Sequence, residues 1–440
     1  MERAVVNVDT GVLVVVMGVQ DAQDVDIKMN ILFIGKIPPI EGGESVSGFN
    51  HILALASKGY KIHVVTNADE VEFNFRQSFT SEDYDYFCTL LGSNIILHNT
   101  HSIKKHFHIP YSHSYFSKLF GLGSKVIVDN PIDLIIGWYF EPYGLLASIL
   151  SKIHNIKSTI YHAGSDLSRL STHPDLFLAY EWMVNNGNTI MSKPSSRESL
   201  ISSFNFNNDK IQIDKGNKLP NYFKKPPKFD LKEYLELSNT HYSKQLNKFP
   251  DLLSAIIKMN SKSLDIENFT IGIYGKISSN KGTSELIKAL SRLSEICKFN
   301  FISVSGGREF NLLSYYESIL SHRKLSENSY ILPFIPHWRI PGFIKKCDVV
   351  VFLENDFPIK IHRPQIPLEV LSQGTCLFLS KDILENLSYK KLMIDQKNFI
   401  CIDKVTQDNL FDKLKDAIED KKKISIIGGH GKSIITFLNG

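Results

Sequence analysis

The chain has 440 residues, of which 43% are hydrophobic and 22% are charged. These fractions are ordinary for a folded globular protein and exclude a disordered, collagen-like or coiled-coil chain. Its 50 basic and 46 acidic residues give a formal net charge of +4, which is too small to indicate nucleic acid as the main partner. Because a single hydrophobic core stops growing at roughly 250–300 residues, the length predicts two domains.

Cysteine usage and hydropathy favour a reducing, cytoplasmic location. The five cysteines form no CxxC pair and are odd in number, so a disulfide framework is not expected. No run reaches the ~18 apolar residues that a membrane-spanning helix needs. The nearest, Gly11–Val19, lacks the basic flank and the cleavage pattern of a signal peptide. We expect residues 1–28 to form an N-terminal extension.

Apolar runs rich in β-branched residues recur along the chain and predict two sets of six strands. The first set is Asn30–Gly35, Lys61–Thr66, Asn94–His98, Ile132–Trp138, Ser158–His162 and Asn188–Ser192. The second set is Phe269–Gly275, Phe299–Ser305, Tyr330–Phe334, Asp348–Leu353, Cys376–Ser380 and Asn398–Ile402. Near-continuous apolar strands are typical of parallel sheets that are covered on both faces. The sequence therefore predicts two doubly wound α/β domains.

Helical patterns separate these strands, and one segment between the two sets interrupts the alternation of strands and helices. The predicted helices are Ser45–Lys58, Pro142–His154, Ser195–Phe204, Thr283–Ser294, Arg339–Lys346, Leu368–Gln373 and Gln407–Asp420. Residues 215–265 are rich in proline, lysine and asparagine, and are predicted to be a linker with a helical insertion. We thus expect one domain over residues 29–214, another over 266–420, and a tail over 421–440. Two such domains would place the ligand in the cleft between them, at the carboxyl ends of the strands.

Glycine-rich loops follow three of the strands. Gly42-Gly43 removes two Cβ atoms in front of a predicted helix, so a ligand could approach the backbone closely. Lys276 and Lys281 straddle the loop after the strand Phe269–Gly275 and could converge on one pyrophosphate. Gly306-Gly307, one strand later, could admit a base or a ribose. Simple turns and solvated lysines are the alternative interpretations.

The segment from His362 to Thr375 carries the richest pattern. Pro367 suits the first turn of a helix, and Glu369 lies one turn inside it, where a carboxylate could accept two ribose hydroxyls. The density of polar residues ahead of the helix favours a ligand loop over a capped buried helix. A further candidate, His162 with Asp166, lies at a strand end, where a structural histidine and a helix cap are the slightly favoured alternative.

These five loops, in this order, resemble glycosyltransferase family 4, the GT-B group of retaining sugar transferases, over most of the chain. The family's second loop reads G-R-x-x-x-x-K-G, in which Lys276 replaces the arginine here. Its final motif is E-x7-E followed by A-x-x-x-G, and Glu369 with Gly374 matches the second half. Ile361 replaces the first glutamate, for which Glu354, Asp356 or His362 could stand in.

The resemblance implies two Rossmann-like domains that face each other, a nucleoside-diphosphate sugar as co-substrate, and no cofactor or metal. The C-terminal domain would bind the donor through Gly275, Lys276, Lys281, Gly306, Gly307, His362, Arg363, Gln365, Ile366 and Glu369. The N-terminal domain would bind the acceptor near Gly42, Gly43, Glu141, Tyr143, His162 and Asp166. The residues expected to act in catalysis are His162, Lys276, Lys281 and Glu369.

Two other functions stay open from the sequence. The loss of the first motif glutamate at Ile361 is compatible with a silent GT-B protein that binds nucleotide without turnover. A sugar-nucleotide epimerase is the third possibility, although no catalytic carboxylates stand out for it. Five histidines between His98 and His113 weakly suggest a metal, and Gly428–Ser433 is not a complete phosphate loop. Lys421–Lys423 could make a weak peripheral contact with anionic lipid.

Overall fold

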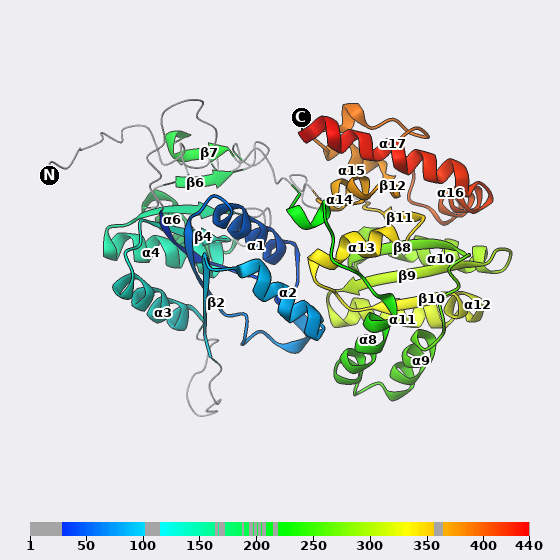
Figure 1. Ribbon diagram of the computed structural model, residues 1–440, viewed down its shortest axis with the longest axis horizontal. Helices are drawn as coiled ribbons and strands as arrows, with labels where there is room; N and C mark the ends of the chain where they lie inside the picture. The colour runs from blue at the N-terminus through cyan, green and yellow to red at the C-terminus, as the bar shows by residue number, and fades with distance from the viewer. Residues whose placement is uncertain are drawn as a thin grey trace.

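The computed structural model describes residues 29–101, 115–162, 172–186, 189–192, 208–213, 219–355 and 364–439, and the single residues 166, 197, 200 and 204. Figure 1 shows two α/β domains side by side, each built on one sheet. This arrangement confirms the predicted fold of two Rossmann-like domains that face each other. The extension predicted over residues 1–28 lies outside the described residues.

The N-terminal sheet has the strand order β3-β2-β1-β4-β5-β6-β7, and every pair is parallel. Its strands are β1 (Asn30–Ile34), β2 (Lys61–Thr66), β3 (Ile95–Asn99), β4 (Leu134–Trp138), β5 (Lys157–Tyr161), β6 (Thr189–Ser192) and β7 (Ile211–Ile213). All six predicted strands are present, whereas β7 was not predicted because three residues carry no readable pattern. The helices are α1 (Gly43–Ala56), α2 (Ser81–Leu91), α3 (Tyr115–Asp129), α4 (Leu145–His154) and α6 (Pro174–Asn186), with short turns η2 (Phe73–Phe75), η3 (Phe140–Gly144) and η6 (Asn208–Lys210).

The C-terminal sheet repeats this topology, in the order β10-β9-β8-β11-β12-β13, again entirely parallel. Its strands are β8 (Phe269–Lys276), β9 (Phe299–Gly306), β10 (Ser329–Leu332), β11 (Val349–Phe352), β12 (Cys376–Ser380) and β13 (Ile400–Ile402). The helices are α10 (Thr283–Ser294), α11 (Glu309–Leu320), α12 (Arg323–Glu327), α13 (Ile340–Lys345), α14 (Ile366–Gln373), α15 (Lys381–Asn386) and α16 (Gln407–Glu419), with η8 (Ser279–Lys281), η9 (His337–Arg339) and η10 (Lys390–Leu392). The strand order reverses between β8 and β11, and ligands of such sheets bind at this point.

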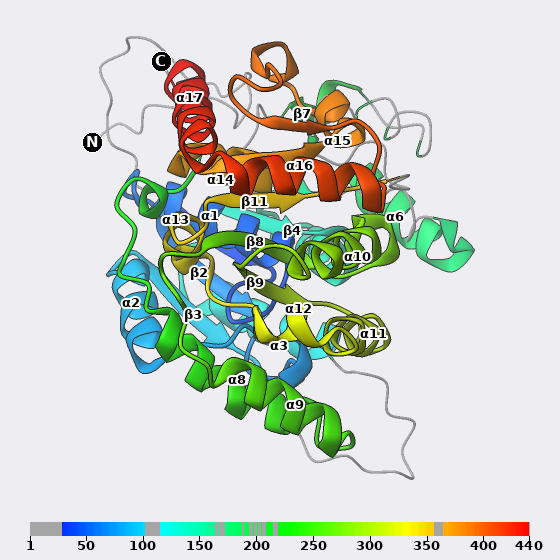
Figure 2. The same ribbon diagram turned by 90° about the vertical axis from the view of Figure 1, so that its right-hand side faces the viewer.

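Helices cover both faces of the C-terminal sheet, as Figure 2 shows. The linker contains η7 (Asn221–Phe223), α8 (Leu231–Gln245) and α9 (Pro250–Asn260), and these two helices pack on β10. The predicted tail contains the 19-residue helix α17 (Lys421–Asn439), which packs on α14 and β12. A Cβ on Gly428 would come within 2.3 Å of Gly374 O, so the glycines of this segment permit close helix packing. None of the helices within the described residues is long and apolar enough to cross a bilayer.

The two domains share one continuous hydrophobic core. Phe49 on α1 and Phe87 on α2 pack against Trp338 of the C-terminal domain, with ring centroids 6.4 and 6.0 Å apart. The fully buried Asp83 carboxylate accepts hydrogen bonds from Arg339 Nε at 2.7 Å and Trp338 Nε1 at 3.0 Å, and another from Tyr234 Oη. We call Asp83, Arg339, Trp338 and Tyr234 the interdomain clasp. It joins α2 of the N-terminal domain to η9 of the C-terminal domain and to α8 of the linker.

Candidate functional site

A cleft of about 980 Å³ lies between the domains, at the upper end of the range of roughly 300–1,000 Å³ for ligand pockets. Its C-terminal wall consists of the loops after β8, β9, β10 and β11, and of the start of α14. Its N-terminal wall consists of residues 41–50, after β1, and of Phe75 and Gln77. The cleft therefore lies at the point that the strand order indicates for each sheet.

Nine of the residues predicted to bind ligands line this cleft. They are Gly42, Gly43, Gly275, Lys276, Lys281, Gly307, Gln365, Ile366 and Glu369. Gly306 is covered instead by the Phe334 ring, which a Cβ at that position would meet at 2.4 Å. His362 and Arg363 lie outside the described residues, as do Ile361 and Asp356.

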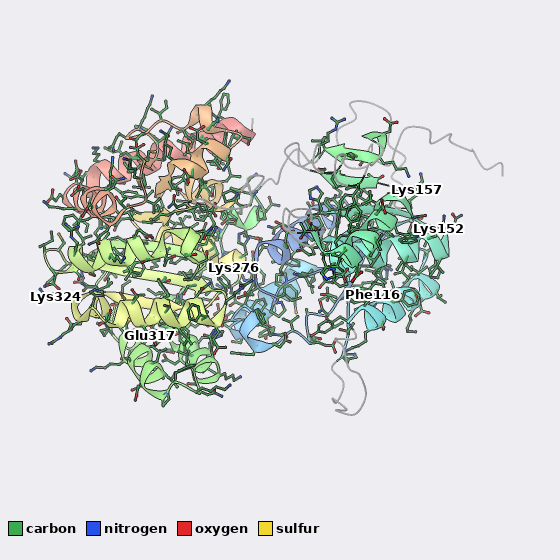
Figure 3. All side chains as sticks on the ribbon, turned by 180° about the vertical axis from the view of Figure 1, so that it is seen from behind. Phe116, Lys152, Lys157, Lys276, Glu317 and Lys324 are labelled. Atoms are coloured by element: carbon green, nitrogen blue, oxygen red, sulfur yellow. The ribbon has the colours of Figure 1, made fainter. Side chains whose placement is uncertain are left out.

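Lys276 is the last residue of β8. Figure 3 shows it on the side of the C-terminal domain that faces the N-terminal domain. A Cβ built on Gly42 would lie 3.8 Å from Lys276 Nζ, so the two walls nearly meet at this point. Gly42 has a φ of 106°, which only glycine adopts without strain, and α1 begins at the next residue. An ammonium group and a helix N-terminus thus face the same space, which is an arrangement suited to an anion.

Lys281 forms an ion pair with Glu354, a side chain that is only 4% exposed. Burial lowers the pKa of Lys281 to about 8, and the charge of Lys276 adds to this effect. The adjacent Glu354 carboxylate acts in the opposite direction and favours the protonated form of the lysine. Glu354 therefore positions a partly buried ammonium group at the cleft, where an incoming phosphate would meet a preorganised cation.

Glu369, in the first turn of α14, is held at both carboxylate oxygens. Tyr274 Oη donates to Oε2 at 2.8 Å, and His337 Nε2 lies 2.8 Å from Oε1. On the other side of the imidazole, His337 Nδ1 lies 2.7 Å from Tyr222 Oη, which also donates to Asn50 Oδ1 at 2.7 Å. A relay of polar groups therefore runs from Glu369 through the linker to α1 of the other domain.

Four predicted acceptor residues, Glu141, Tyr143, His162 and Asp166, are not among the described residues that line the cleft. Tyr143 is buried and donates its hydroxyl to Asn67 Oδ1 at 2.9 Å. His162 is buried beside Ser192, with Nε2 and Oγ 3.0 Å apart. Asp166 accepts a hydrogen bond from the backbone N of Phe140 at 3.2 Å. These contacts hold the His162 and Asp166 side chains within the N-terminal domain.

The cleft also contains groups that sequence reasoning missed. Burial raises the pKa of Glu41 to about 7, although the charge of Lys276 acts against this rise. Lys36 is not among the residues that line the cleft, but burial lowers its pKa and the charge of Lys276 adds to this effect. Glu41 directly precedes Gly42, so the glycine pair could have drawn attention to it. His337 follows β10, and the rule that ligands gather at carboxyl ends could have pointed to it.

The histidine-rich segment gives no metal site in the part of the chain that the structure describes. His98 Nε2 lies 3.0 Å from His63 Nδ1 on the neighbouring strand, and the two rings stack. Burial lowers the pKa of each imidazole, as expected where the neutral form is favoured. The pair is thus a partly buried hydrogen-bonded contact between β2 and β3.

Known proteins share this architecture. Residues 257–432 match the sequence profile of the family described as "Glycosyl transferases group 1". HepE of Anabaena in complex with UDP-glucose superposes with a TM-score of 0.58 at 17% identity, covering 93% of this chain and 95% of that one. WaaG, a glycosyltransferase involved in lipopolysaccharide biosynthesis, gives 0.57 at 12% identity over 92% and 95% of the two chains.

The sucrose-phosphate synthase of Thermosynechococcus elongatus gives a TM-score of 0.56 at 12% identity, over 93% of this chain and 94% of that one. No curated protein sequence matches the chain. At these identities the structural likeness shows the fold alone. The chain has the GT-B fold, and its C-terminal domain matches the glycosyl transferases group 1 family.

Proposed function

We propose that the protein is a retaining glycosyltransferase that transfers a sugar from a nucleoside-diphosphate donor to an acceptor. The observation that carries this proposal is that Lys276, Lys281 and Glu369 line one interdomain cleft. Two ammonium groups suit a diphosphate, and a carboxylate suits the hydroxyl groups of a ribose. The match of residues 257–432 to a glycosyltransferase family and the UDP-glucose bound to HepE support the same assignment.

In this proposal, each group has a distinct task. Lys276 and Lys281 neutralise the diphosphate, which gains charge as it leaves the sugar, so fixed cations lower the barrier. Glu369 accepts the ribose hydroxyls, and Tyr274 and His337 hold its carboxylate in place. Closure of the two domains over the bound donor would exclude water and so limit hydrolysis of the donor. Because cations stand where other transferases use a metal, we expect the reaction to persist in EDTA.

The test is to incubate the protein with a panel of UDP-, ADP-, GDP- and TDP-sugars and to measure the release of nucleoside diphosphate. We expect slow hydrolysis of at least one donor, with the Lys276→Met variant inactive. A failure of every donor to react or bind would overturn the proposal.

A silent nucleotide-binding protein is the second candidate, because Ile361 stands where the related family has a glutamate. Calorimetry would then detect nucleotide binding without turnover, whereas measured transfer would exclude this candidate. Exchange of isotope at C2 of the donor sugar would instead identify an epimerase.

A further inference from the structure

The N-terminal wall of the cleft is built from two paired backbone segments. Ile40 and Arg76 form an antiparallel bridge, and Glu41 N donates to Phe75 O at 2.8 Å. Side chains alternate across paired segments, so Glu41 and Phe75 lie on the face opposite to Ile40 and Arg76. Gln77 shares the face of Glu41 and Phe75, and all three line the cleft.

Phe75 offers an open aromatic face at this wall. Its side chain is 48% exposed. Phe73, on the same turn, is 38% exposed but is not among the residues that line the cleft. Its ring centroid lies 4.9 Å from that of His241 and 4.9 Å from Lys244 Nζ. The two phenylalanines therefore have different surroundings, although they are close in sequence.

The two other residues of this face carry hydrogen-bond acceptors. Glu41 contributes a carboxyl group, and Gln77 contributes an amide whose Oε1 is buried and finds no donor among the described residues. The Gln77 side chain is held by its Nε2, which donates to Ile40 O at 3.3 Å. Sugar hydroxyls donate to such oxygens, while the apolar C–H face of a pyranose packs against an aromatic ring.

We propose that Glu41, Phe75 and Gln77 form a subsite for a carbohydrate acceptor, so that the group receiving the transferred sugar is itself a sugar. This inference rests on the proposed function, because the subsite adjoins Gly42, which faces Lys276 across the cleft. The wall is anchored to the opposite domain where Ser78 N donates to Phe334 O at 2.8 Å. The subsite is thus formed before any ligand arrives.

Saturation-transfer difference NMR with methyl glycosides of glucose, galactose, mannose and N-acetylglucosamine tests this subsite, with and without UDP. We expect signals from the ring protons of at least one glycoside with the wild-type protein. Phe75→Ala and Glu41→Gln should reduce them about 5-fold or more, as loss of one good contact predicts. Phe73→Ala is the matched control and should leave them unchanged.

Equal signals from Phe75→Ala and Phe73→Ala would overturn the subsite, as would the absence of any glycoside signal while UDP binds. Calorimetry with UDP, ADP, GDP and TDP separates this failure from failure of the proposed function. If glycosides bind in a Phe75-dependent way but no nucleotide binds, the subsite stands and the transferase proposal falls. Thermal melting of each variant reports whether it is folded.

Discussion

The two walls of the cleft position their polar groups in different ways. On the C-terminal wall, side chains hold side chains: Glu354 pairs with Lys281, and Tyr274 with His337 holds Glu369. On the N-terminal wall, backbone pairing places Glu41 and Phe75. Contacts between side chains hold a few charged groups in fixed positions for one ligand. Paired backbone segments instead hold several neighbouring side chains on one surface. In the proposed function, the C-terminal wall binds the diphosphate and ribose that nucleotide donors have in common, and the N-terminal wall binds the acceptor.

The interdomain clasp keeps these walls opposed, and breaking it should have the largest effect. Asp83→Asn removes the buried carboxylate partner of Arg339 and leaves only the exposed Glu82, 3.5 Å from Arg339 Nη2, so we expect a loss of about 3–5 kcal/mol in the free energy of unfolding. Urea denaturation measures this loss. Asp85→Asn, an exposed change on the same helix, is the control and should cost under about 0.5 kcal/mol. Similar stabilities of the two variants would contradict the role of the clasp.

Lys276→Met should weaken binding of the nucleoside diphosphate that the protein prefers by about 10–100-fold, because it removes a charge-assisted contact with the diphosphate. Lys276 is exposed, so we expect little change in stability. Titration calorimetry measures the affinity, and Lys288→Met, an exposed change on α10, is the control. Equal loss in both variants would show that only overall charge matters.

The relay between the walls should matter less than the charges themselves. Tyr222→Phe removes the hydroxyl that joins Asn50 to His337, and His337→Gln removes the imidazole that holds Glu369. We expect each change to weaken binding of the same nucleoside diphosphate by about 3–10-fold. Because the two residues act through one relay, the double variant should lose less than the product of the single losses. Fully additive losses would contradict the relay.

The smallest expected effect is a dependence on pH. The pKa of Lys281 is lowered to about 8, so its ammonium charge is present at pH 7 and is lost as the pH rises through 8. The affinity for the nucleoside diphosphate should therefore fall by about 2–5-fold between pH 7 and 9. Lys281→Arg keeps its charge over this range and should flatten the profile. An identical decline in that variant would assign the effect to another group.

Much of the fold was predictable from the sequence, since continuous apolar runs mark buried parallel strands such as Lys61–Thr66, which is β2. Lys276 and Glu369 could be identified because they follow strands, where ligands of this fold gather. The clasp could not be predicted, because Asp83 and Arg339 are brought together only by tertiary packing. Phe75 could not be predicted either, because it reaches the cleft only through backbone pairing with residues that precede Gly42.

The most direct test of the account is a crystal structure with the nucleoside diphosphate that binds most tightly. We expect the diphosphate to lie between Lys276 and Lys281, and the ribose hydroxyls to donate hydrogen bonds to the Glu369 carboxylate. A nucleotide bound elsewhere, or a ribose that does not touch Glu369, would contradict it.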